Sequence, residues 1–499
     1  MVFNSLPFAY FFAYVFVLYQ LIGLSQYIPK TSRYYIFATF KLDVFKDAHQ
    51  WQNVLLLIAS YYFYGQWSQN FLIAIAAVSS ISFFSGYFIE KTDNSTHRKI
   101  AVWIACLFLG GSLAYMKYFN FFIDTTRDVA TIFGLKWDVQ NIKLIVIVGL
   151  SYYIFTSIGY VVDVYRRKIK AELNPITYFA YVSFFPHVLS GPIAQATHLL
   201  PQFNQKRVFD VRKIEDGIMQ FAWGMFKKVV IADSLVKSIS YLFFTYNDQP
   251  GSVLLLGAIM YSFQVYADFS GYSDMACGLA RILGFEVIQN FKLPFFSRDI
   301  GEFWRRWHIS LSKWLTSYFY VPLGGKSPKR HIYIRNILLT FSFSGLWHGA
   351  NWTYITWGFL NGLYFVPYIL SGSMRKYDDV VAHNHFLPNV KELGQMLLTF
   401  TLVCFSRVFF RSPDMMSAFG YFKHMFSWSL FSFPDFGLVN MAWIGGLVIF
   451  EWMNREKRYP LSNEGKYGWL RYPAMVAIVG LIYYAMRENP TTEYLYFKF

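Results

Sequence analysis

The sequence has few charged residues and few cysteines. Asp, Glu, Lys and Arg make up 15% of its 499 residues, whereas a soluble domain usually contains about 25%. The three cysteines, Cys106, Cys277 and Cys404, are far apart and lie in apolar segments. They lack metal-ligand spacing, so we expect them to be small buried side chains. The scarcity of charge excludes an ordinary soluble protein.

Several familiar enzyme motifs are also missing. The sequence has no HExxH pair, no clustered carboxylates and no cysteine pair, so no metal site is expected. It has no GxSxG elbow, Walker A loop or dinucleotide fingerprint. It also has no internal repeat, which weakens a transporter interpretation, because many transporters consist of paired inverted halves.

Apolar and aromatic residues are abundant instead. Hydrophobic residues make up 55% of the chain and aromatic residues 21%, and the mean hydropathy is +0.31. This composition is typical of a polytopic membrane protein, in which aromatic side chains fill the bundle and anchor both interfaces. The first apolar run, about 8–28, has no charged start and no cleavage site, so we expect it to span the membrane.

Apolar runs of about 17 to 25 residues are long enough to cross a bilayer. Such runs, or shorter approximations to them, lie at about 8–28, 53–66, 70–89, 100–119, 142–164, 216–240, 252–283, 333–346, 351–371, 394–410, 437–452 and 470–486. We predict an all-α polytopic membrane protein with about eleven transmembrane helices. It forms one integral-membrane domain over 1–499, with its core at about 260–371 and C-terminal spans and an aromatic tail over 394–499.

Two segments do not fit a simple span. Residues 31–52 carry both charges and aromatic rings, and we expect an interfacial insert. The apolar segment 174–193 is interrupted by Pro175, Pro186, Gly191 and Pro192. A re-entrant or kinked element explains these interruptions better than a regular helix.

The net charge of +16 comes from basic residues in short loops between apolar runs. This distribution favours membrane topology over nucleic-acid binding, and it places the basic loops in the cytoplasm. We therefore expect a multi-pass protein of the cell inner membrane. The basic clusters are Arg166, Arg167, Lys168 and Lys170; Lys206, Arg207, Arg212, Lys213, Lys227 and Lys228; and Arg298, Arg305, Arg306, Lys313, Lys326, Lys329, Arg330 and Arg335.

Two histidines, His308 and His348, lie forty positions apart, and each directly follows a tryptophan. An ionisable group within a membrane segment is a candidate for function. Glycines flank His348 and allow close approach of backbone or substrate. Burial would keep its imidazole neutral, as a general base requires. The alternative is a packed histidine that hydrogen-bonds a neighbouring helix.

Two cations, Arg305 and Arg306, come just before the Trp307-His308 pair. They would disfavour the imidazolium form, or they would bind phosphate groups, because a guanidinium matches phosphate with two hydrogen bonds. The alternative is an interfacial anchor of aromatic and basic residues.

Two carboxylates, Asp268 and Asp274, lie six residues apart in an apolar segment. They would orient a histidine or pair with Arg281 or Arg298. A helix cap or another buried ion pair is an equally good explanation.

Three motifs together resemble a known family. They are Phe303-Trp-Arg-Arg-Trp-His-Ile-Ser-Leu-Ser-Lys-Trp, Tyr320-Val-Pro-Leu-Gly-Gly and Gly345-Leu-Trp-His-Gly-Ala-Asn-Trp. They resemble the membrane-bound O-acyltransferase family, and most of all its bacterial alginate O-acetyltransferase branch. Further similar segments are Tyr266–Asp274, Asn290-Phe291, Ser190-Gly191-Pro192 and Trp223–Asp233.

The resemblance implies a helical bundle around a central funnel and acyl transfer from a thioester, with acetyl-CoA as the expected donor. It implies that His348 is catalytic and that His308 supports the chemistry or donor binding. Donor-binding residues would be Arg305, Arg306, Lys313 and Trp307. The branch often has an Arg-Asp pair before the Tyr-x-Pro-Leu-Gly-Gly run, but this sequence has Thr316-Ser317, so a charge-pair role at that place is in doubt.

The C-terminal aromatic segment 493–499 resembles a short motif of this branch and of small partners of related systems. It raises the hypothesis that Tyr496 is an acyl relay. The alternative is an interfacial aromatic anchor.

The expected function is O-acetylation of an exported, alginate-like polysaccharide or of peptidoglycan, together with a periplasmic transferase partner. D-alanyl or other acyl transfer to a teichoic acid-like polymer is the alternative within the enzyme class. A non-enzymatic transporter or a scaffold of an exopolysaccharide system is the alternative outside it.

Overall fold

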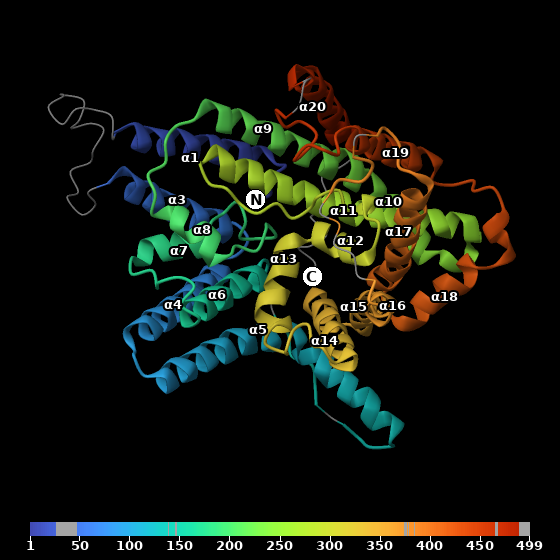
Figure 1. Ribbon diagram of the computed structural model, residues 1–499, viewed down its shortest axis with the longest axis horizontal. Coiled ribbons are helices and arrows are strands. Elements are labelled where there is room, and N and C mark those ends of the chain that lie inside the picture. Colours follow the sequence, from blue (N-terminus) through green and yellow to red (C-terminus); the bar gives the residue numbers. More distant parts are fainter. Residues whose placement is uncertain are drawn as a thin grey trace. The chain divides into compact units, whose positions relative to one another are not determined.

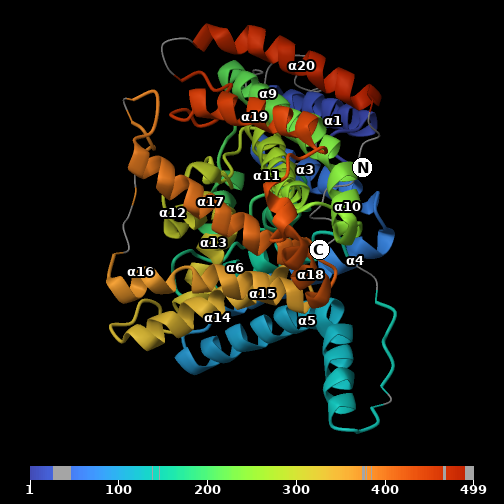
Figure 2. The same cartoon turned by 90° about the vertical axis from the view of Figure 1, so that its right-hand side faces the viewer.

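A computed structural model describes residues 1–25, 47–137, 139–144, 147–373, 377, 379–383, 385–464 and 468–488. Every regular element within these ranges is helical (Figures 1 and 2), which confirms the all-α prediction for them. Two compact units can be distinguished. Unit 1 contains residues 1–218 and 276–288, and unit 2 contains residues 219–275 and 289–499. The single integral-membrane domain stays a prediction.

Unit 1 is a bundle of apolar helices. Its complete helices are α1 (Leu6–Ser25), α3 (Ala48–Gly65), α4 (Gln69–Lys91), α5 (Ser95–Ile132), α6 (Leu150–Tyr165), α7 (Pro175–Ser183) and α8 (Ala196–Phe203). Helix α4 packs against α5 and α6, and α3 packs against α1 and α7 (Figure 1). Arg98 donates a hydrogen bond to the carbonyl of Tyr165 over 3.0 Å. The start of α5 and the end of α6 are therefore at the same end of this unit.

The irregular apolar segment predicted at 174–193 lies inside unit 1. Helix α7 ends at Ser183, and the chain has no regular helix until α8 begins at Ala196. All residues from Ser183 to Ala194 are buried. Because Pro186 and Pro192 lack a backbone N–H, they interrupt the helix there. The prediction of a kinked, buried element is confirmed.

Unit 2 contains the histidine motifs. Its elements are η1 (Lys227–Ala232), α10 (Asp233–Phe244), α12 (Ile300–Arg306), α13 (Ile309–Leu315), η4 (Thr316–Tyr320), α14 (Arg330–His348), α15 (Trp352–Leu363), α16 (Val366–Ser371), α17 (Val390–Arg411), α18 (Met415–Met425), α19 (Leu438–Met453) and α20 (Arg471–Glu488). Helices α9 (Val211–Phe226) and α11 (Gly251–Ile282) contribute residues to both units.

Helices α14 and α15 form a tightly packed pair that lies side by side in Figure 2. Glycines allow the close approach. A Cβ atom at Gly345 would collide with the backbone carbonyl of Tyr354, and one at Gly358 would collide with that of Phe341. This pair fixes the end of α14, where His348 is the last helical residue.

Six of the described helices are long and apolar enough to cross a membrane, namely α1, α4, α5, α11, α17 and a segment that includes α20. In the most apolar window of α1 only 22% of the residues are buried, whereas the figure for α11 is 83%. Helix α1 thus presents its side chains outward, as contact with lipid requires, and α11 is enclosed by protein. The protein is a multi-pass membrane protein, and the count of about eleven spans stays a prediction.

Several predicted boundaries were wrong. The run 142–164 is not one helix, because α6 begins only at Leu150. The run 216–240 is divided by the π-helical turn η1, and the run 351–371 is divided between α15 and α16. Helix α18 was not predicted. The interfacial insert falls mostly on residues 26–46, which lie outside the described residues, and its end enters α3.

Candidate active site

His308 lies between two short helices, α12 and α13, outside the six candidate spans. Its backbone is left-handed, with φ 44° and ψ 54°. This conformation is uncommon for a residue other than glycine and costs about 1–3 kcal/mol. The side chain is buried, and burial lowers the pKa of His308 to about 3. The imidazole is therefore neutral near pH 7. Burial alone causes this shift, whereas the sequence suggested a contribution from the neighbouring arginines.

Asn290 holds the unusual turn at His308. Its backbone carbonyl accepts a hydrogen bond from the N–H of Ile309 over 3.0 Å. Its side-chain oxygen accepts one from the N–H of Ser310, also over 3.0 Å. Its side-chain amide donates to Ser273 Oγ on α11 over 3.1 Å. Asn290, Ser273 and Ser310 are all buried. A single asparagine thus connects both residues that follow His308 to the central helix.

His348 ends α14 and is enclosed by aromatic rings. Its imidazole centroid is 5.2 Å from the nearest ring of Trp357 on α15 and 5.2 Å from the ring of Phe410 on α17. The helix stops here because Gly349 adopts an extended conformation. Asn351 then caps α15 by accepting a hydrogen bond from the N–H of Thr353 over 2.9 Å. Three helices therefore position one buried imidazole.

Trp347 links the two histidines. Its ring centroid is 6.0 Å from that of His308 and 4.8 Å from that of His348. His308 also contacts Phe269 of α11, with centroids 4.6 Å apart. Residues forty positions apart in the sequence thus meet at one indole ring. The structure brings together the two histidines that the sequence singled out.

The four residues predicted to bind a donor have different surroundings. Arg305 and Lys313 are exposed. Arg306 forms an ion pair with Glu302 over 2.6 Å. Trp307 is buried, and the guanidinium of Arg407 lies 4.1 Å from the centroid of its ring. Arg305 and Lys313 can therefore meet a ligand, while Arg306 and Trp307 are engaged within the protein.

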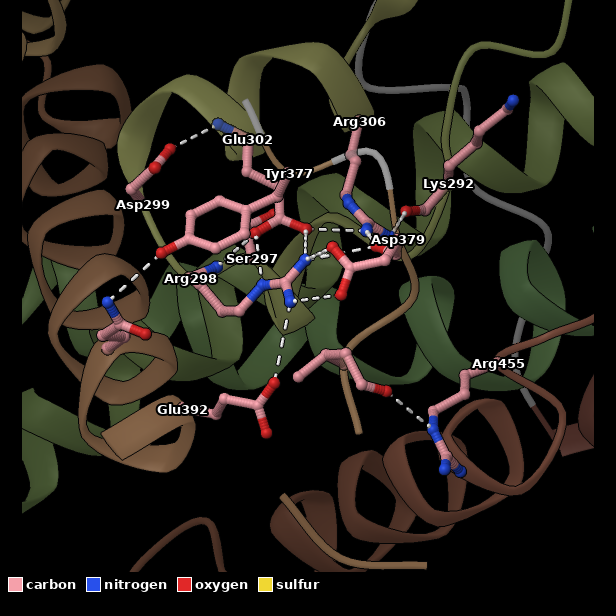
Figure 3. Close-up of polar contacts among 12 residues, drawn as sticks. Lys292, Ser297, Arg298, Asp299, Glu302, Arg306, Tyr377, Asp379, Glu392 and Arg455 are labelled. Atoms are coloured by element: carbon pink, nitrogen blue, oxygen red, sulfur yellow. Dashed lines mark hydrogen bonds and ion pairs between the residues drawn. The ribbon is translucent and has the colours of Figure 1, made fainter. Parts of the chain in front are cut away.

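An ion cluster holds the helix that leads to His308 (Figure 3). Arg298 pairs with Glu302 of α12 over 3.1 Å, with Asp379 over 2.9 Å and with Glu392 of α17 over 3.6 Å. The guanidinium also lies 4.0 Å from the ring centroid of Tyr377. Hydrogen bonding from Arg298 lowers the pKa of Asp379 below its usual value. The cluster attaches α12 both to α17 and to residues after α16.

A second buried network joins η1 to α11. Lys227 Nζ lies 2.5 Å from Asp274 and 2.9 Å from Ser270 Oγ. Lys228 Nζ lies 2.7 Å from Asp268 and 2.8 Å from Asp233. Both lysines are buried. Phe269 and Ser273, which lie between these aspartates in the sequence, make the contacts to His308 and Asn290 described above. The same stretch of α11 therefore serves the ion network and the histidine.

Arg281 and Arg298 were the wrong partners for these carboxylates, and the alternative of another buried ion pair is confirmed. Asp268 and Asp274 pair with lysines of η1, whereas Arg298 pairs with Glu302, Asp379 and Glu392. Arg281, the other predicted partner, pairs with Asp216 over 2.7 Å within unit 1. The basic clusters also need correction, because Arg207, Lys227, Lys228 and Arg298 are buried and so do not belong to a solvent-exposed basic surface.

Comparison with known families decides the class. The family model described as "MBOAT, membrane-bound O-acyltransferase family" matches residues 54–376, about two thirds of the chain. The protein belongs to the membrane-bound O-acyltransferase family. It is an O-acyltransferase that requires an acyl donor, and the family confirms the resemblance found in the sequence.

Curated relatives of this acyltransferase cover most of its length. It is 37% identical over 410 residues to "Probable alginate O-acetylase AlgI" of Pseudomonas aeruginosa, with 81% of this chain and 75% of the relative covered. It is 31% identical over 418 residues to "Peptidoglycan O-acetyltransferase" of Helicobacter pylori, with coverages of 77% and 76%. A more distant relative is "Teichoic acid D-alanyltransferase" of Bacillus subtilis, 26% identical over 278 residues, with coverages of 53% and 68%.

Sequence reasoning missed several residues of this candidate site. Trp347 was noted only as a neighbour of His348, and its contact with His308 depends on the fold. Asn290 appeared in a family-like dipeptide without a role. Lys292 is exposed, and its backbone N–H donates to the carbonyl of Arg306 over 3.0 Å. The Arg306 side chain donates back to the Lys292 carbonyl over 3.4 Å (Figure 3). The sequence did not indicate that Lys292 adds a positive charge beside the histidine motif, because Lys292 precedes that motif in the chain and is brought next to it by the fold.

Proposed function

We propose that the protein transfers an acetyl group from cytoplasmic acetyl-CoA across the cell inner membrane for O-acetylation of an exported polysaccharide or of peptidoglycan. The observation that carries this proposal is the meeting of His308 and His348 at Trp347 inside a chain of the O-acyltransferase family. The names of the alginate and peptidoglycan relatives support acetyl as the acyl group and a cell-surface polymer as the acceptor.

His348 acts as the general base. It takes the proton of the attacking hydroxyl while the hydroxyl oxygen bonds to the thioester carbonyl carbon. The carbon–sulfur bond then breaks, and the departing thiolate receives the proton from the imidazolium. An ester and a free thiol result, so no oxidant or reductant is needed. Such general-base assistance contributes about 10²–10⁴-fold to the rate. His308 supports this step as a neutral imidazole.

Exposed cations near His308 receive the phosphates of the donor. Arg305, Lys313 and Lys292 are exposed and lie on the segments that form the His308 turn. A guanidinium binds phosphate through two hydrogen bonds, and an ammonium binds it as a point charge. Arg306 and Trp307 contribute by holding this region in place rather than by touching the donor. The basic loops are then cytoplasmic, as the positive-inside rule predicts.

The last step is transfer of the acetyl group to its acceptor. The acetyl group leaves towards the outer face, where a periplasmic transferase passes it to the polymer. Tyr496, which lies outside the described residues, stays a proposed acyl relay to such a partner. The relative that transfers D-alanine makes D-alanyl the alternative acyl group. Membership of an acyltransferase family argues against the carrier and scaffold alternatives.

Purified protein in nanodiscs with acetyl-labelled acetyl-CoA tests the proposal. We expect thioester loss and label transfer in the wild type, loss of both in His348→Ala, and a strong reduction in His308→Ala. His331→Ala is the matched control, because His331 is an exposed histidine of the same helix α14. A folded His348→Ala protein with full turnover would show that the base has been misassigned.

The donor and the relay need separate measurements. Arg305→Ala and Lys313→Ala should raise KM for acetyl-CoA with little change in kcat, because phosphate contacts bind the ground state and the transition state alike. A D-alanyl thioester that replaces acetyl-CoA with equal kcat/KM would favour the alternative acyl group. Mass spectrometry of the C-terminal peptide in donor-loaded, acceptor-free protein tests Tyr496, and an absence of acylation refutes the relay.

A further inference from the structure

Unit 1 contains a buried polar turn that the proposed chemistry does not use. After α7 the chain makes a helical turn, in which the N–H groups of His187 and Val188 donate to the carbonyl of Phe184 over 3.0 and 3.1 Å. The N–H of Gly191 then donates to the carbonyl of His187 over 3.0 Å. Residues three apart in such a turn lie on the same face. His187 and Ser190 therefore face the same way.

Both side chains are buried and have polar atoms without a partner. His187 is 3% exposed and Ser190 is 1% exposed. Among the described residues, His187 Nε2 and Ser190 Oγ make no hydrogen bond. The imidazole of His187 packs against the ring of Phe184, with centroids 5.6 Å apart. An unsatisfied buried polar atom costs about 1–3 kcal/mol, so two of them on one face indicate a bound partner.

The backbone of this turn is closely packed against its neighbours. A Cβ atom at Gly191 would collide with His187 Cα, so the turn is tightly closed. A Cβ atom at Gly149, at the start of α6, would lie 2.7 Å from the carbonyl oxygen of Val188 and 3.2 Å from Leu189 Cα. The backbone of the turn therefore packs directly against the start of α6. Irregular backbone at membrane depth is tolerated where it is buried in protein or lines a water-filled cavity.

We propose that His187 and Ser190 form a hydroxyl-binding site buried within unit 1. In a neutral imidazole one ring nitrogen carries no hydrogen and accepts a hydrogen bond, and we assign this role to the unpartnered Nε2, which accepts from an incoming hydroxyl. Ser190 Oγ donates to the same oxygen. Cβ atoms of residues three apart lie about 5–6 Å from each other, and O–H···O bonds are about 2.7–2.8 Å long, so one oxygen reaches both groups. Water and a saccharide hydroxyl share this chemistry.

The site is tested by thiol accessibility, which does not depend on enzymatic activity. Cys106, Cys277 and Cys404 are first replaced by alanine, and Ser190→Cys is introduced. A small charged methanethiosulfonate reagent should label this cysteine about tenfold faster or more than a control cysteine, because the reaction needs an accessible thiolate. The matched control is Ser183→Cys. Ser183 is an equally buried serine whose hydroxyl donates to the Phe179 carbonyl over 2.7 Å.

The outcomes separate the two sources of the hydroxyl. Labelling of Ser190→Cys that slows when an alginate oligosaccharide is added assigns the site to a saccharide. Labelling that no oligosaccharide slows assigns it to water. Equal labelling of the two cysteines, or none at either, overturns the proposal. Should Ser190→Cys fail to fold, diethyl pyrocarbonate modification of His187 in the wild-type protein decides: modification supports the proposed site and complete protection refutes it. The proposal stands whether or not His348 is the base.

Discussion

Replacing Asn290 by leucine should disturb His308 without touching either histidine. Leucine has the same branched skeleton of four side-chain heavy atoms as asparagine but no hydrogen-bonding groups, so the change removes the hydrogen bonds. The buried N–H of Ser310 loses its acceptor, which costs about 1–3 kcal/mol, and the lost bond to Ser273 adds about 0.5–1.5 kcal/mol. We therefore expect a loss of about 2–4 kcal/mol in the free energy of unfolding. Released from its clamp, His308 can leave the strained left-handed conformation.

The assay measures kcat and KM for acetyl-CoA together with thermal unfolding in the same nanodiscs. A displacement of about 1 Å in a reacting group lowers the rate about 100-fold, so kcat should fall by about that factor while KM changes little. Ser273→Ala is the matched control, because it removes only one of the hydrogen bonds and should cost about 1 kcal/mol. If folded Asn290→Leu protein kept the wild-type kcat while His308→Ala protein lost it, Asn290 would not position His308.

Three further predictions concern stability and are read from unfolding temperatures. Lys228→Met leaves two buried carboxylates without their cation and should destabilise by about 3–5 kcal/mol, whereas Lys237→Met on the exposed face of α10 should change stability by less than about 0.5 kcal/mol. Gly358→Ala forces α14 and α15 apart and should cost about 1–3 kcal/mol. Gly445→Ala in α19 meets no atom within 4 Å and should stabilise by about 0.5–1 kcal/mol. Burial lowers the pKa of His308 to about 3, so below about pH 6.5 the unfolded protein takes up a proton at this residue and the folded protein does not. The free energy of unfolding then falls by about 1.4 kcal/mol for each pH unit. His308→Gln should therefore lose less stability than the wild type between pH 7.5 and 4.5, and equal losses would contradict the lowered pKa.

The helices that sequence reasoning located well are those with a single unbroken apolar run. Helix α4 was expected at 70–89 and found at Gln69–Lys91, and α11 was expected at 252–283 and found at Gly251–Ile282. Prediction failed where polar groups are buried in pairs. Lys227 and Lys228 looked like surface charge, because Asp274 and Asp268, which pair with them, are 47 and 40 positions away; Asp233, the second partner of Lys228, is close in the sequence. Pairing over such distances leaves no trace in local periodicity.

Contacts between distant residues were also missed at the candidate site. The motifs identified His308 and His348 one at a time, and the family resemblance suggested their roles. Their shared contact with Trp347 arises from the packing of α11, α13 and α14, and no spacing rule predicts it. Similarly, Asn290 is an ordinary polar residue in the sequence. It becomes important because the fold places it beside the turn that His308 begins.

The pairing of η1 with α11 has a consequence for biogenesis. The ribosome delivers Lys227 and Lys228 before Asp274 and Asp268 exist, so a nascent chain that ends before α11 has Asp233 as a partner for Lys228 but lacks the carboxylate that pairs with Lys227. Charged residues at the centre of a helix each oppose insertion by about 2.5–3.5 kcal/mol. We therefore expect stable integration of η1 to follow the synthesis of α11, so that the two segments enter the bilayer together. Chains truncated before residue 268 should remain within reach of the insertion machinery and be preferred substrates of membrane quality control.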